Sequence, residues 1–88
     1  MALDRLAHGI AAELRDLAAA TEGLAAALCA DPDIAGRCLG LLQQFDLIAQ
    51  SQCELADLLL RLNAGTERDE ALQAMRLAGM AERLAQAA

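Results

Sequence analysis

The chain has 88 residues, a formal net charge of −6 and Phe45 as its one aromatic residue. A chain of this length forms one small domain, and its Ala-rich composition predicts a thin core, so we expect self-association. All seven basic side chains are Arg and are scattered along the chain, which together with the acidic balance disfavours nucleic acid as a partner.

The first predicted helix covers residues 2–29. Two rows of mainly apolar residues recur through it every seven positions, as in the seam between paired helices. The rows are Leu3, Ile10, Leu17 and Leu24, and Ala7, Leu14, Thr21 and Leu28. The next helix is predicted to begin at Pro32, because Asp31 can accept hydrogen bonds from free backbone N–H groups and Pro fits a first helical turn.

The second predicted helix covers residues 32–63 and pairs with the first as an antiparallel hairpin. Its apolar rows are equally regular. They consist of Ile34, Leu41, Ile48, Leu55 and Leu62, and of Cys38, Phe45, Gln52 and Leu59. Gly65 is predicted to end this helix, because glycine readily adopts the left-handed conformation found after helix ends. Phe45 is predicted to be buried.

The third predicted helix covers residues 67–87. Thr66 is its expected N-cap, with Asp69 or Glu70 near the reciprocal capping position and Glu67 in the first turn. Its larger apolar side chains include Leu72, Met75, Leu77 and Met80. They have two interpretations, of which the first is favoured: packing against the hairpin, or a surface that receives a partner helix.

Three leucines of the second helix, Leu42, Leu58 and Leu60, lie outside its two rows. This helix therefore has more apolar surface than one neighbour can cover, and the third helix, a second subunit or both must cover the rest. We expect an all-α single domain over residues 1–88 and a homodimer in which two hairpins form a four-helix bundle. A monomeric three-helix bundle is the alternative.

Two polar residues, Thr21 and Gln52, interrupt the otherwise apolar rows. A polar residue at such a position can fix the register and the number of helices that associate, at some cost in stability. The equally weighted alternative is that each lies at a solvated edge of the pair.

Asp46 and Gln50 stand one helical turn apart at positions that face away from the apolar rows. Spacing alone favours an ordinary solvated surface for such a pair. The alternative is that the two side chains carry chemistry.

The segment FDLIAQ, residues 45–50, resembles the active-site helix of the chemotaxis phosphatase CheZ family, in which an Asp-x-x-x-Gln pair follows a Phe. Family members carry this pair on a long hairpin that dimerises into a four-helix bundle. The resemblance covers residues 43–54 and the hairpin architecture. By resemblance, Gln50 would orient a water that attacks the aspartyl phosphate of a response regulator, and Asp46 would contact a regulator lysine.

This chemistry needs positioning and charge neutralisation more than a covalent helper, so one amide can matter greatly. The metal would be the regulator's own Mg²⁺, and we expect no cofactor or metal site in this chain. The chain departs from the family in two respects. It is far shorter, and a tight connection at residues 63–70 stands where the family has a flexible linker before a regulator-binding helix.

His8 raises a second signalling hypothesis, a phosphoacceptor on a helical hairpin. Gly9 stands where kinases usually carry an acidic residue, and no Lys follows, so an exposed structural His is the better interpretation. Cys29, Cys38 and Cys53 lack C-x-x-C spacing, which favours small buried or half-buried thiols over a zinc or redox site.

No apolar run reaches the roughly 18 residues of a membrane span. Asp4 and Arg5 interrupt the start, where a signal peptide needs its apolar region. We therefore expect a soluble cytoplasmic protein without a membrane partner. The first functional hypothesis is a non-catalytic helical interaction and dimerisation module, in the setting of bacterial two-component signalling. The alternative is a CheZ-like auxiliary phosphatase with a response regulator as partner.

Overall fold

A computed structural model describes residues 2–87, and this part of the chain contains helices and no strands, as predicted. Residues 1 and 88 of the predicted domain lie outside the described residues. The helices are α1 (Ala2–Cys29), α2 (Pro32–Arg37), α3 (Leu39–Asn63), α4 (Arg68–Gln73) and α5 (Ala78–Ala87).

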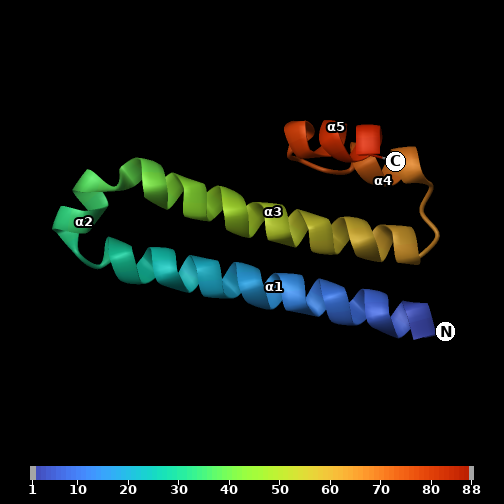
Figure 1. The fold of residues 1–88 in the computed structure, drawn as a ribbon, viewed down its shortest axis with the longest axis horizontal. Helices are drawn as coiled ribbons and strands as arrows, with labels where there is room; N and C mark the ends of the chain where they lie inside the picture. Colours follow the sequence, from blue (N-terminus) through green and yellow to red (C-terminus); the bar gives the residue numbers. More distant parts are fainter. Residues whose placement is uncertain (1, 88) are drawn as a thin grey trace.

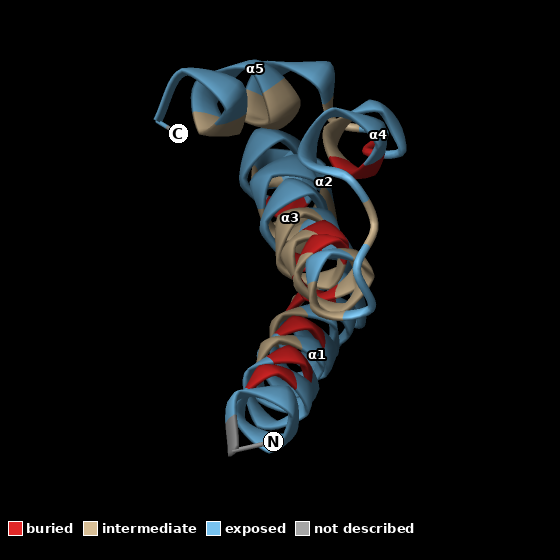
Figure 2. Ribbon diagram, turned by 90° about the vertical axis from the view of Figure 1, so that its right-hand side faces the viewer, coloured by how far each residue is buried: buried red, intermediate tan, exposed pale blue. Residues whose placement is uncertain are grey.

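The long helices α1 and α3 run antiparallel and side by side, with α2 at their closed end (Figure 1). The pair α4 and α5 lies against α3 on the side away from α1 (Figures 1 and 2). The molecule measures 48 × 26 × 17 Å. Its smallest dimension accommodates little more than one layer of helices, each about 10–12 Å across with side chains. The hairpin has two broad faces, one on each side of the plane that contains α1 and α3, and no further helix within residues 2–87 covers either of them.

Small side chains form the interface between α1 and α3. Most of the residues buried between the two helices recur every seven positions, and Ala56 is 0% exposed. They are Ala11, Ala18 and Ala25 on α1, and Leu42, Ala49 and Ala56 on α3. Alanine at a contact lets helix axes approach toward the lower end of the usual range of about 8–10 Å.

The predicted leucine rows are not the buried interface of the hairpin. Leu17 is 52% exposed and Ile48 is 46% exposed, while Phe45 is half-buried. Ala7 alone among the predicted row members is buried within the hairpin. The physical reason is that the neighbouring alanine rows allow a closer approach of the backbones, which turns the leucines toward one broad face.

Two polar pairs hold the hairpin in register. The Asn63 side-chain amide donates to the Asp4 carboxylate across 2.6 Å, and the Arg15 guanidinium donates to the Asp57 carboxylate across 2.9 Å. Asp4 and Asn63 continue the two alanine rows by one heptad, so these rows end in a polar pair. The Arg15–Asp57 pair is about half exposed on both sides, and such pairs contribute only about 0–1 kcal/mol.

The second predicted helix is divided at Cys38. Asp31 is the N-cap of α2 as predicted, since its carboxylate accepts from the Asp33 N–H across 2.9 Å, and Pro32 lies in the first turn. The backbone then leaves helical geometry at Cys38, with φ −116° and ψ 27°. Gly36 and Gly40 flank this break, and glycine lowers helix stability by about 1 kcal/mol each.

The end of α3 follows the prediction, and the start of α4 does not. Gly65 has a left-handed backbone with φ 93°, which closes the helix. The N-cap of α4 is Glu67 and not Thr66, because the Glu67 carboxylate reaches the N–H groups of Asp69 at 3.0 Å and Glu70 at 3.3 Å. Glu67 itself has the extended backbone typical of an N-cap.

The third predicted helix is also divided, between Gln73 and Ala78. Glu54 on α3 provides the reason. Its carboxylate accepts hydrogen bonds from the backbone N–H groups of Arg76 and Leu77, the latter across 3.0 Å, which occupies donors that a continuous helix would use internally. The segment then folds back, and Arg68 donates to the Ala85 carbonyl oxygen across 2.7 Å.

Candidate functional site

Asp46 and Gln50 are both exposed on α3. They lie one turn apart, and each is about 200° around the helix from Ile48 at 3.6 residues per turn. They therefore project from the broad face of the hairpin opposite to the leucines. The Arg15–Asp57 pair and the exposed His8 belong to the same polar side of the hairpin by helical position.

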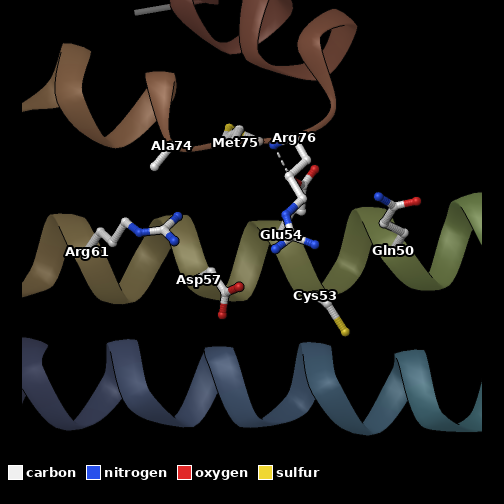
Figure 3. A pocket seen from close by; sticks show the side chains of 8 residues that line it. All are labelled: Gln50, Cys53, Glu54, Asp57, Arg61, Ala74, Met75 and Arg76. Carbon is white, nitrogen blue, oxygen red and sulfur yellow. Dashed lines mark hydrogen bonds between the residues drawn. The ribbon is translucent and has the colours of Figure 1, made fainter.

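Gln50 also borders a groove between α3 and the link from α4 to α5, with a volume of about 250 Å³. Figure 3 shows Gln50 at one end and Arg61 at the other, with the link passing over Glu54. Asp46 is not among the lining residues. The groove combines two arginines, two carboxylates and a thiol, in Arg61, Arg76, Glu54, Asp57 and Cys53. Glu54 is committed to the backbone of the link, and Asp57 to Arg15.

Exposed apolar side chains line one broad side of the hairpin, and we call this surface the leucine face. Its exposed members are Leu3, Leu6, Ile10, Leu17 and Leu24 on α1, and Leu41, Ile48 and Leu62 on α3. Leu3, Leu6 and Ile10 line one shallow hollow together with Leu59 and Leu62, which places the two helices' leucines on the same side of the hairpin. Heptad spacing carries this face along both helices.

The four residues predicted to contact a partner are engaged within the chain. Met75 is buried in a cluster with Leu58 and Ala71, and Leu72 and Met80 pack against that cluster. Leu77 is half-buried and donates its N–H to Glu54. This arrangement agrees with the interpretation of the third segment as packing, and it covers Leu58, one of the three leucines outside the predicted rows.

The remaining reactive residues form no joint site in the described part of the chain. His8 is exposed, and its ring donates from Nδ1 to the Asp4 carbonyl oxygen across 2.9 Å. Cys38 and Cys53 are half-buried as expected, whereas Cys29 is exposed, and all three are free thiols. Residues 2–87 contain no group of His, Cys, Asp and Glu arranged to hold a metal ion.

Among the described residues, no helix combines the length and the apolar character needed to cross a bilayer.

Sequence reasoning missed Glu54, which is buried at 9% exposure and determines where α5 begins. An acidic residue between Cys53 and Leu55 carries no signal of this role, because its partners lie more than twenty residues away. The alanine rows did carry a signal, since Ala11, Ala18 and Ala25 repeat every seven residues beside the leucines. The leucines beside them are larger and more hydrophobic, so the hydrophobic pattern predicted that the leucine rows would form the contact between the helices.

Comparisons with protein-family models, with curated proteins and with solved structures found no match to this chain.

Proposed function

We propose that the protein is a helical self-association module, in which two hairpins join through their leucine faces and form a four-helix bundle. The supporting observation is the set of eight exposed Leu and Ile side chains that define this face on α1 and α3. Monomeric proteins rarely expose a continuous apolar surface of this kind, and larger patches mark interaction sites.

The dimensions of the leucine face fit this proposal. Its members run from Leu3 to Leu24 on α1 and from Leu41 to Leu62 on α3, which corresponds to a length of about 32 Å at 1.5 Å per residue. Two helices with axes about 9 Å apart present a strip roughly 18 Å wide. The face therefore offers roughly 580 Å², close to the approximately 600 Å² per partner at the lower end of stable interfaces.

A second copy is the partner that this face fits best. Every member of the face is apolar, so it offers a charged partner no complementary groups. A copy presents the same heptad spacing over the same length, and matching spacing allows side chains of facing helices to interdigitate. Exposed Glu13 lies one heptad after Leu6 and so borders the face, where solvent can screen its repulsion at physiological ionic strength.

Sedimentation equilibrium tests this proposal with a matched pair of variants. Ile48 belongs to the leucine face, whereas Leu39 is at least as exposed, at 60%, on the same helix but points elsewhere. We expect the wild type and Leu39→Glu to sediment as dimers. Ile48→Glu should shift the mass to that of a single chain, because it places a charge in the apolar contact. A wild type that stays monomeric at high micromolar concentration overturns the proposal.

A second candidate function is auxiliary phosphatase activity toward a response regulator, by resemblance to the CheZ family. The exposure of both Asp46 and Gln50, on the face opposite to the leucines, supports it. Self-association through the leucine face leaves this pair free to enter another protein's active site. The two proposed functions are therefore compatible in one dimer.

Dephosphorylation of the organism's response regulators tests the second candidate. We expect the wild type to accelerate phosphate loss and Gln50→Ala to abolish the acceleration, because the attacking water loses its positioning group. Asp46→Ala should mainly weaken engagement of the regulator. Gln43→Ala is the matched control, since Gln43 is exposed one heptad before Gln50 on the same face. Equal decay with and without the protein for every regulator rejects this function.

A further inference from the structure

Gln52 carries an unsatisfied polar atom. Its Oε1 is buried and has no hydrogen-bond partner among the described residues. A buried carbonyl oxygen without a donor has lost its hydrogen bonds to water and has not replaced them, which destabilises the folded state. Thr21, the other polar residue in the predicted rows, is different, because its hydroxyl donates to the Leu17 carbonyl oxygen across 2.9 Å. Of the two polar residues in the predicted rows, Gln52 is therefore the one whose side-chain oxygen lacks a hydrogen-bond donor.

The position of Gln52 is unusual in two ways. It lies one residue from the midpoint of α3, which spans Leu39–Asn63. It also lies at the edge of the leucine face, about 40° around the helix from Ile48 at 3.6 residues per turn. A dimer formed through the leucine face therefore covers Gln52 at the centre of the bundle.

Two hairpins can stack face to face with two-fold symmetry in two ways. In one, their closed ends lie together and each α3 contacts the partner's α1. Asp4 on α1 lies level with Asn63 on α3. The helices are antiparallel, so the residue eleven positions after Asp4, Arg15, lies level with the residue eleven positions before Asn63, which is Gln52. Arg15 is paired with Asp57 on the polar face, and the residues of α1 that reach the leucine face at this level are Leu14 and Leu17. Gln52 Oε1 then meets only apolar side chains.

In the other arrangement the closed ends lie at opposite ends of the bundle. Each α3 then runs antiparallel against the α3 of the second copy, and the two-fold axis crosses both near their midpoints. Gln52 lies close to that axis and faces Gln52 of the partner subunit. A primary amide has both N–H donors and a carbonyl acceptor, so two copies of it can bond reciprocally.

We propose that Gln52 pairs with the partner subunit's Gln52 across the two-fold axis, and that this pair selects the dimer with closed ends at opposite ends. Each amide rotates toward the other and donates an N–H to the other's Oε1. This inference rests on the proposed self-association. Single polar residues in apolar helical interfaces fix register and subunit number in the same manner, at some cost in affinity.

Pulsed electron paramagnetic resonance on spin-labelled full-length chains tests the arrangement. With Cys29, Cys38 and Cys53 replaced by Ala, labels are attached at Gln50→Cys or at Gln43→Cys, two exposed sites one heptad apart that leave the leucine face intact. Around an axis at Gln52, the two labels at residue 50 are separated along the bundle by about 6 Å, and those at residue 43 by about 27 Å.

We therefore expect the residue 43 pair to be clearly farther apart than the residue 50 pair. Equal distances at the two sites place the closed ends together and overturn the inference, while the dimer itself stands. A monomeric wild type overturns both the inference and the proposed function.

The role of the amide is tested by Gln52→Leu in both labelled chains. We expect this variant to associate at least as tightly as the wild type, because it replaces a polar group by an apolar one of similar size. Each distance distribution should however divide into two populations, one for each arrangement. A Gln52→Leu dimer that keeps the single wild-type distribution at both sites shows that the amide pair does not select the arrangement.

Discussion

Glu54 ties α3 to the backbone of the C-terminal segment. Its carboxylate accepts from two consecutive N–H groups of the link between α4 and α5, and 9% of the residue is exposed. Hydrogen bonds to a charged acceptor contribute about 1.5–3 kcal/mol each when they are shielded from water. One residue of α3 thereby decides that the C-terminal segment folds back and covers Leu58.

Replacing Glu54 by Ala should lower the free energy of unfolding by about 3 kcal/mol, because two backbone donors lose their acceptor. Glu54→Gln should lose about half as much, since its amide retains one carbonyl oxygen. Urea denaturation at fixed chain concentration gives both values. Glu82→Ala, at an exposed position of α5, is the control and should change stability by less than about 0.5 kcal/mol. Equal stability of all three variants would show that the link does not depend on this carboxylate.

At the scale of elements, the packing of α1 on α3 depends on small side chains at all but one of the repeated contact positions, Leu42 being the exception. Ala18, Ala49 and Ala56 occupy positions where a Leu would hold the helices apart. The consequence is that the leucines beside them stand on the broad face of the hairpin and not between its helices. The apolar surface that would otherwise form an intramolecular core is thus available for intermolecular contact.

Ala56→Leu should destabilise the protein by about 1–3 kcal/mol, because the added atoms overfill a tightly packed contact. Ala12→Leu is the control, since Ala12 is exposed on α1 and Leu is nearly as good a helix former as Ala. Thermal melting followed by circular dichroism compares the two variants at one chain concentration. An Ala56→Leu protein as stable as the wild type would mean that the helices have room to separate.

At the scale of the whole molecule, a single layer of helices leaves much of its apolar surface in contact with water. The buried residues of the hairpin are mostly alanines, which contribute little apolar area each. Small domains of this kind commonly gain the missing stability by association. Folding and self-association are therefore expected to be coupled in this protein.

Coupled folding and association predict that the melting temperature depends on chain concentration. A tenfold increase in concentration stabilises a folded dimer by about 1.4 kcal/mol, which corresponds to a rise of about 3–6 °C for a dimer of this size. Melting curves over a hundredfold range of concentration measure this rise. A constant melting temperature over that range would instead indicate that one chain folds by itself.

The sequence by itself determined the helical class, the antiparallel pairing expected of two long heptad patterns, and several element ends. Asp31, Pro32 and Gly65 act as predicted because caps and turns depend on the conformations and hydrogen bonds of neighbouring residues. The exposure of Asp46 and Gln50 was predictable in the same way, from their angle to the apolar rows.

Only the tertiary structure decided which rows of α1 and α3 meet and where the later helices break. Heptad spacing is shared by the leucine and alanine rows, so the choice between them depends on how closely two backbones approach. The break before α5 depends on Glu54, whose hydrogen-bond partners are brought to it by the fold. Local patterns contain no information about such contacts, because the contacts exist only once distant segments have packed together.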